Sequence, residues 1–228
     1  MTPTTGNNLP APFSYLIGKH WCTLDTETTG LGHGHQIVEI AVKDGLTGDM
    51  LLNTLVRPTR AIDPGAERIH GISNAEVALA PTWPEVRYQL MGAVKNKTVC
   101  IYNANFDIKM LVQSNEAWNI NCNGYFGAKE YFCVMTEYAR RARIYNHLYG
   151  GNRNFKLINA AKLEGIPLPQ SLHRAAADVE VTQALVSKIL SEFVVSANEP
   201  QFEEFGPEFD DPQWEEIDMP DAEPWRES

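Results

Sequence analysis

A short apolar run that ends in two carboxylates constrains the fold of this chain more than any other feature. Residues His20–Leu24 predict a buried strand, and Asp25-Thr26-Glu27 follow it directly. Side chains two residues apart on a strand point to the same face, so the two acids would lie together and repel each other. A bare Asp-x-Glu is most often a pair of exposed acids. At the end of a core strand, however, a hard cation would offset the repulsion, so the pair indicates a metal site.

The other apolar segments predict a mixed α/β fold. Two further strands, Gln36–Val42 and Met50–Val56, flank turn residues at 44–48 and therefore predict a hairpin. Later strands are expected at Thr98–Tyr102 and Tyr131–Val134, and helices at Pro84–Val94, Phe106–Val112, Thr136–Tyr145, Phe155–Glu164 and Ala175–Phe193. Three antiparallel strands followed by strands that alternate with helices favour one mixed sheet with helices on both faces.

The distribution of charge separates an acidic tail from a nearly neutral body. The chain has 228 residues and a formal net charge of −10. Residues 197–228 contain twelve acids and one base, which leaves about +1 for the rest of the chain. A neutral body can still bind phosphate if its positive charges are concentrated at one site. We expect a loose N-terminal arm at residues 1–15, one domain at 16–195, and a disordered acidic tail at 196–228.

Hydropathy and cysteine usage bear on the location of the protein. No stretch approaches ~18 consecutive apolar residues, so we expect no transmembrane helix and no membrane partner. Residues 1–12 lack the basic start and apolar run of a secretory signal. The cysteines show no metal-ligand spacing, and free thiols suit a reducing compartment. A cytoplasmic protein is therefore expected.

Two further segments place acids at the start of predicted helices. Asn103-Ala104-Asn105-Phe106-Asp107 follows a strand, and His173-Arg174-Ala175-Ala176-Ala177-Asp178 opens the last helix. Taken alone, Asp107 is most simply an acid that complements a helix dipole. His173 and Asp178 alone are most simply a cap and a surface acid. Combined with the acidic pair on the first strand, and in this order, the segments are harder to explain as independent caps and surface acids.

The combination resembles the motifs of the DEDDh (DnaQ-like) 3′→5′ exonucleases, a family that includes polymerase proofreading subunits, RNase T and oligoribonucleases. The matching motifs are DTETTG, NANFD and HRAAAD, and Arg68-Ile69-His70-Gly71-Ile72 is similar to a fourth family element. His173 lies five residues before Asp178, which is the spacing of the histidine branch rather than the tyrosine branch. The resemblance covers residues 18–192 and implies an RNase H-like fold with a five-stranded sheet.

The resemblance also implies the roles of the site residues. Its metal ligands would hold two divalent cations, Mg²⁺ with Mn²⁺ as a substitute; they are Asp25, Glu27, Asp107 and Asp178. Two such ions, ~3.5–4 Å apart, can hold the attacking and leaving oxygens of a phosphoryl displacement. His173 would be the general base, because an imidazole with an ordinary pKa near ~6.5 can accept a proton close to neutral pH.

Substrate contacts follow from the same resemblance. Thr28 and Leu31 match positions that contact the terminal nucleotide, with Leu31 against its base, and His70 matches a histidine beside the scissile nucleotide. Gly30 would let the backbone approach a ligand closely, and we also expect Asn103 to contact substrate. Two alternatives remain open: Gly30 as an ordinary turn glycine, and His70 as a residue that caps a turn.

Basic residues give a weaker signal. Arg174 adjoins the predicted base and could contact a phosphate, although a surface role fits equally well. Lys156 and the cluster Arg140-Arg141-Ala142-Arg143 could guide a strand of nucleic acid, although a basic run on a helix is usually a solvated face. The segments 119–129 and 147–154 contain no motif.

The expected function is hydrolysis of phosphodiester bonds at a nucleic-acid 3′ end, releasing nucleoside 5′-monophosphates, with single-stranded DNA as the expected substrate. Alternatives are a 3′→5′ exoribonuclease of the same fold and a polymerase-associated proofreading subunit, because the motifs do not separate 2′-OH from 2′-H. A non-catalytic nucleic-acid-binding or interaction factor is more distant, since it needs no cluster of five ionisable groups. The tail, rich in acids, Phe and Trp, could be solubilising, dock a replication or repair protein, or fold back on the active site.

Overall fold

The structure is a computed structural model of the whole chain. It describes residues 12–121, 126–142, 145–146, 151–152, 154–169 and 173–198. Residues 1–11 of the predicted arm and residues 199–228 of the predicted tail lie outside the described part. In the described ranges, no helix is both long enough and apolar enough to cross a membrane.

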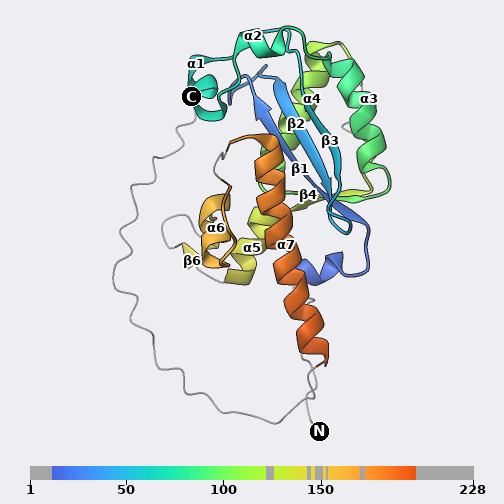
Figure 1. Cartoon of the computed structure of the whole chain (residues 1–228), viewed down its shortest axis with the longest axis vertical. Helices are drawn as coiled ribbons and strands as arrows, with labels where there is room; N and C mark the ends of the chain where they lie inside the picture. Colours follow the sequence, from blue (N-terminus) through green and yellow to red (C-terminus); the bar gives the residue numbers. More distant parts are fainter. Residues whose placement is uncertain are drawn as a thin grey trace. The chain divides into compact units, whose positions relative to one another are not determined.

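A five-stranded mixed sheet forms the centre of the domain (Figure 1). Its strands are β1 (Trp21–Thr28), β2 (Ile37–Asp44), β3 (Met50–Leu55), β4 (Thr98–Ile101) and β5 (Glu130–Cys133). The spatial order is β3-β2-β1-β4-β5; the first three strands pair antiparallel, and β4 and β5 are parallel to β1. The predicted fold class is confirmed.

Helices cover both faces of this sheet, as predicted. They are the 3-10 helix η1 (Pro12–Leu16) and the α-helices α1 (Pro64–His70), α2 (Asn74–Val77), α3 (Trp83–Val94), α4 (Ala104–Ala117), α5 (Val134–Ala142), α6 (Leu157–Leu163) and α7 (Ala175–Asn198). Two short strands, β6 (Tyr145–Asn146) and β7 (Gly151–Asn152), form a separate ribbon. Figure 1 shows α7 crossing one face of the main sheet.

Alternating side chains along β1 divide the core into two parts. Cys22 and Leu24 pack with α3 and α4 on one face, whereas Trp21 packs with η1, α5, α6 and α7 on the other. Thr23 also points to the α7 face, where its hydroxyl donates to the Val179 carbonyl at 3.2 Å. By the same alternation, the next odd-numbered residues of β1 face α7 as well.

The structure differs from the sequence-based expectations at several places. The helix predicted over Thr136–Tyr145 ends at Ala142, and α7 continues to Asn198, three residues into the predicted tail. The predicted loose arm extended to residue 15, but Phe13 and Leu16 are fully buried, so apolar contacts hold the chain from η1 onward. The acidic pair was expected at the end of the first strand, and the pairing of β1 with β2 includes both acids and continues one residue further, to Thr28. Helix α1 was not predicted, although Pro64 at its first position and Gly71 (φ 72°) after its end are typical helix boundaries.

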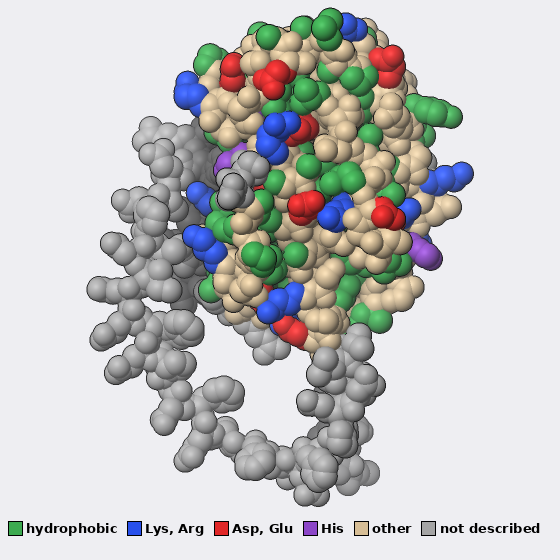
Figure 2. All heavy atoms as spheres, in the orientation of Figure 1, with side chains coloured by type: hydrophobic (Ala, Val, Ile, Leu, Met, Phe, Trp, Pro, Cys, Tyr) green, Lys and Arg blue, Asp and Glu red, His purple; other side chains and the backbone are tan. Residues whose placement is uncertain are grey.

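Charges of both signs are distributed over the surface of the domain. On the face drawn in Figure 2, acidic and basic side chains are interspersed among the described residues. This agrees with the nearly neutral charge of the chain outside the tail. Attraction of a polyanion would therefore depend on a few cations at the site itself.

Candidate active site

The acids of the predicted site meet where β4 ends. The pairing of β1 with β4 stops at Leu24 and Ile101, so Asp25 and Glu27 lie beyond the end of β4. Asp107 lies in the first turn of α4, which begins directly after β4, and Asp178 lies in the first turn of α7. Carboxylate oxygens of Asp25, Glu27 and Asp178 lie within 4.8 Å of one another.

One cavity of about 200 Å³ collects all five residues that the sequence predicts to be catalytic. Its lining includes His173 and Asn103 together with the four acids. Asp107 is buried, and its Oδ1 accepts a hydrogen bond from the Thr26 hydroxyl at 2.7 Å. Asn103 is the N-cap residue of α4, but its side chain does not cap the helix and is exposed. The structure therefore brings these residues together from three distant segments.

The surrounding protein and mutual repulsion raise the pKa values of the clustered carboxyl groups. Burial raises the pKa of Glu27 to about 8, and repulsion from Asp178 and Glu39 adds to the effect. Burial also raises the pKa of Asp25 well above its usual range, with further repulsion from Asp107. The pKa of Asp107 is raised by burial although its hydrogen bond from Thr26 opposes the shift. The cluster disfavours its own ionised form.

The donor set fits a divalent cation. Carboxylate oxygens are the ligands that hard cations prefer, and a cation would replace the protons that the crowded acids otherwise retain. Among the described residues, Asp25, Glu27 and Asp178 form a group whose ligand atoms converge closely enough to hold a metal ion. The acidic site is therefore able to bind a divalent metal.

A second cavity, of about 650 Å³, adjoins the first and shares Thr26, Glu27 and Phe106 with it. The remaining predicted substrate contacts line this second cavity; they are Thr28, Gly30, Leu31 and His70. Every predicted contact except Asn103 thus lies beside the cavity of the four acids rather than within it.

Close packing, rather than an ordinary turn, accounts for Gly30. A Cβ atom at this position would lie 2.4 Å from Cε1 of His35, and the Oδ2 atom of Asp63 would be 2.9 Å away. The His35 ring is held in place by its Nδ1 atom, which lies 3.0 Å from the hydroxyl of Thr29. Glycine lets this loop pack against His35 at the wall of the second cavity.

His70 uses both ring nitrogens within the protein. Its Nδ1 atom accepts a hydrogen bond from the Ile72 amide at 3.0 Å, so its Nε2–H donates to the Thr28 carbonyl at 3.2 Å. Burial lowers the pKa of His70, which favours this neutral form. The contacts agree with the alternative role as a turn cap, and they also fix the loop that carries Thr28.

Three of the basic residues singled out in the sequence are paired with carboxylates. Arg143 lies outside the described residues, and none of the ion pairs among the described residues involves Lys156. Arg140 pairs with Glu137 at 2.9 Å, and Arg141 pairs with Glu192. Arg174 binds Glu39 on β2 through Nε and Nη2, which leaves only Nη1 of its guanidinium without a carboxylate. Sequence reasoning missed Glu39, although a single acid within the apolar run QIVEIAV was a signal of a specific partner.

Comparisons with known proteins agree with this geometry. The profile of the RNase T exonuclease family matches residues 22–186. An uncharacterized exonuclease of Escherichia phage 186 is 35% identical over 168 residues, which cover 73% of this chain and 86% of that protein. DNA polymerase III subunit epsilon of Pasteurella multocida is 30% identical, over 69% of this chain and 63% of the subunit. The chain therefore spans less than two thirds of that polymerase subunit.

A solved structure of Exonuclease X in complex with 5′ overhanging duplex DNA shares the fold. It has a TM-score of 0.55 and 28% sequence identity, and the match covers 76% of this chain and 93% of that chain. The resemblance inferred from the sequence motifs is confirmed.

The raised pKa of Glu27 predicts that the metal-free protein loses stability as the pH rises. Glu27 has a pKa of about 8 when folded and ~4.3 when unfolded, so the folded state binds more protons between these values. Stability from this group is complete below the unfolded pKa and is lost as the pH rises through about 8. We expect the Tm in EDTA to fall between pH ~6.5 and ~8, and to fall less for Glu27→Gln.

The chosen pH range excludes the opposite effect of two histidines on the stability of the folded protein. Burial lowers the pKa values of His35 and His70, so their effect on stability is confined to pH values below ~6.5. Thermal denaturation of both proteins at several pH values, with and without Mg²⁺, measures the difference. Equal slopes for wild type and Glu27→Gln would contradict the raised pKa of Glu27 in the folded protein.

Proposed function

This chain belongs to the RNase T exonuclease family, and on that premise we propose that it removes nucleotides from the 3′ end of single-stranded DNA with the help of two Mg²⁺ ions. The observation that carries the proposal is the convergence of carboxylate oxygens of Asp25, Glu27 and Asp178 within 4.8 Å. A non-catalytic binding module would gain nothing from such repulsion. An exonuclease uses such closely spaced carboxylates to hold cations.

In this proposal the four clustered acids hold the cations, with Mn²⁺ as a substitute for Mg²⁺. When bound, the cations would lower the pKa of an attacking water and stabilise charge on the phosphate. Because the pKa values of Glu27 and Asp25 are raised, their carboxyl groups must release protons for a cation to bind. Metal affinity is therefore expected to increase with pH.

His173 is proposed to accept the proton of the attacking water. It is exposed, lines the cavity of the four acids, and has a left-handed backbone with a φ of 64°. Burial raises the pKa of the Asp178 carboxyl group, and the neighbouring His173 opposes this shift. These features support a role in which the imidazole accepts a proton beside the acids without being a metal ligand.

The second cavity is proposed to hold the terminal nucleotides. Exposed apolar side chains of Leu31 and Ile69 belong to its lining and could contact a base. Arg68 lines the same cavity and is exposed, and none of the ion pairs among the described residues involves it. Arg60 nearby, in contrast, lies 3.7 Å from Asp63. Arg68 is therefore the cation that we propose to bind a phosphate of the strand.

A second candidate function is proofreading in association with a polymerase, which is favoured by the 30% identity to a DNA polymerase III epsilon subunit. A 3′→5′ exoribonuclease of the same fold is the alternative, because the motifs do not separate 2′-OH from 2′-H. Docking of a replication or repair protein on the acidic tail, and a cytoplasmic location, are part of the proposal. The tail itself lies outside the described residues.

Degradation of labelled oligonucleotides tests the function directly. With Mg²⁺ we expect 5′-labelled single-stranded DNA to shorten from its 3′ end and to release nucleoside 5′-monophosphates, and EDTA to abolish this. Double-stranded DNA and both forms of RNA should be degraded more slowly. Asp25→Asn should fold but cleave no faster than wild type in EDTA, because it removes a proposed metal ligand. Cleavage by that variant at the wild-type rate would refute the metal assignment.

Replacement of the proposed base should affect catalysis and not metal binding. We expect His173→Ala to lower kcat by about 10²–10⁴-fold, the usual contribution of a positioned acid–base group. Calorimetric titration should show unchanged Mn²⁺ affinity. His20→Ala, at an exposed histidine before β1, is the matched control and should leave kcat unchanged. If the Mn²⁺ affinity of His173→Ala collapses, the histidine is a metal ligand instead.

Removal of the Arg68 guanidinium should weaken substrate binding in a salt-dependent way. We expect Arg68→Ala to raise KM at low salt and to reduce the slope of log KM against log salt by ~0.7, the value for one single-strand phosphate. Arg68→Lys should keep most of this slope. Lys95→Ala is the control, because this exposed cation precedes β4 at the opposite end of the strand from the site. Identical slopes for Arg68→Ala and wild type would contradict a phosphate contact.

A further inference from the structure

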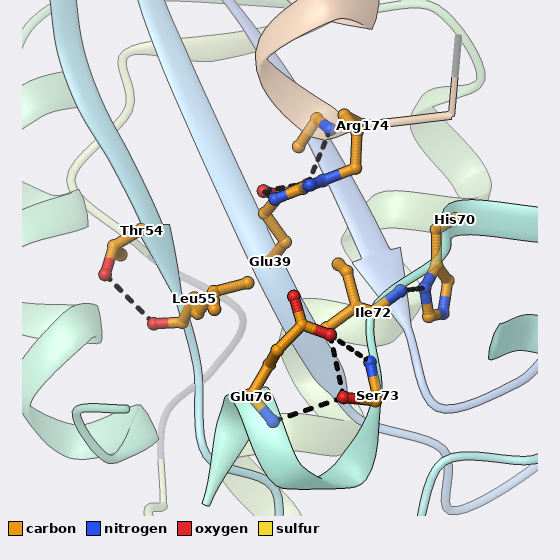
Figure 3. Close-up of polar contacts among 9 residues, drawn as sticks. Glu39, Thr54, Leu55, His70, Ile72, Ser73, Glu76 and Arg174 are labelled. Carbon is orange, nitrogen blue, oxygen red and sulfur yellow. Dashed lines mark hydrogen bonds and ion pairs between the residues drawn. The ribbon is translucent and has the colours of Figure 1, made fainter. Parts of the chain in front are cut away.

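A bidentate ion pair between Glu39 and Arg174 joins β2 to the start of α7 (Figure 3). Nε of Arg174 lies 3.1 and 3.0 Å from the two carboxylate oxygens of Glu39, and its Nη2 lies 2.6 Å from Oε1. The Ala175 amide donates to Oε2 at 2.9 Å. The side chain of Glu39 is only 5% exposed, so the start of α7 satisfies both oxygens of a buried carboxylate.

Glu39 and Glu27 are direct partners in the antiparallel pairing of β1 and β2. Side chains of directly opposite residues lie on the same face of a sheet, and like charges there are destabilising. The two acids differ in their contacts. Glu39 is bound by Arg174 and Ala175, whereas the Glu27 carboxylate has no hydrogen bond to a described residue. One acid is thus saturated by protein donors, and the facing acid is left open to a cation.

The Glu39 contacts fix the first turn of α7. The first amides of a helix lack partners within the helix, and Glu39 accepts the one from Ala175 with a charge that suits the helix N-terminus. The carbonyl oxygen of Arg174 accepts the amide of Asp178 at 3.0 Å. His173 immediately precedes Arg174 in the chain. The anchored arginine is therefore directly connected to both site residues of this segment.

Other contacts hold the rest of the helix. Val179 and Ala175 pack against Ala41 on β2, and Lys43 on the same strand lies 3.4 Å from Glu180. These contacts would keep α7 on the sheet without Glu39. The specific contribution of Glu39 is the placement of the first turn, which carries the site residues.

We propose that Glu39 and Arg174 are a pair of positioning residues for the active site. The pair holds His173 and Asp178 in place against the acids of β1. It also keeps the guanidinium on Glu39 and away from Glu27, which must remain free for a cation. The inference rests on the proposed function, and it assigns to Arg174 a role other than binding phosphate.

The test uses Glu39→Gln, which keeps the shape of the side chain and removes its charge. We expect kcat to fall about 10–100-fold and the Mn²⁺ dissociation constant to rise by a similar factor, as for residues that orient metal ligands. KM for the oligonucleotide should not change. Glu180→Gln is the matched control, because it breaks an ion pair between the same strand and the same helix. It should leave kcat, KM and Mn²⁺ affinity at wild-type values.

A double-mutant cycle separates a pair from two independent residues. Arg174→Gln should lower kcat, and its side chain is 41% exposed, so the protein should tolerate the change. The kcat of the double variant should be no lower than that of the less active single variant, because both changes remove the same interaction. Arg174→Lys, which keeps the charge but not the bidentate contact, should recover part of the lost kcat.

Three results would overturn the proposal. The first is wild-type kcat and Mn²⁺ affinity in folded Glu39→Gln. The second is a raised KM with unchanged kcat in Arg174→Gln, which would make the arginine a substrate contact. The third, decisive if Glu39→Gln does not fold, is wild-type kcat in Arg174→Gln. An inactive wild-type protein on all four oligonucleotides would instead refute the proposed function, so the two failures are distinguishable.

Discussion

Repulsion among carboxylates at the end of β4 is the interaction on which the rest of the site depends. Asp25 and Glu27 remain on β1 after its parallel partner has ended, and the first turns of α4 and α7 add Asp107 and Asp178. Without a cation this arrangement costs stability, and protons or ions must offset the cost. Extensive cores on both faces of the sheet allow the fold to maintain such a site.

The crowding of carboxylates also bears on the contacts of the facing acids on β1 and β2. Across β1 and β2, Glu39 is paired with an arginine while Glu27 is not, so only one of two facing acids stays available.

Beside them, Gly30 packs on His35, and the neutral His70 holds the carbonyl of Thr28. Fixed loops therefore enclose a second cavity next to the acids. The arrangement suits the proposed substrate, the 3′ end of a nucleic acid whose last phosphodiester would lie at the acids.

The short apolar runs predicted the sheet, because strand formation leaves a local signal. The cluster of acids was predicted because the motifs that contain them resemble those of a known exonuclease family. The sequence did not predict that Glu39 faces Glu27, because that contact depends on strand register, which the turn of residues 29–36 sets in three dimensions. Nor could it identify the partner of Arg174, which lies 135 residues away in the chain. Helix α1 was missed because it is short and has few apolar residues to show a helical period.

The binding of Mn²⁺ tests the central claim most directly, because it requires no choice of substrate. Titration calorimetry of the metal-free protein should give two ions per chain, with affinity that increases from pH ~6.5 to ~8 as the raised carboxyl pKa values predict. Asp25→Asn should lose this binding. Equal stoichiometry and affinity in wild type and Asp25→Asn would contradict the account, because the acids at the end of β4 would then not form the metal site.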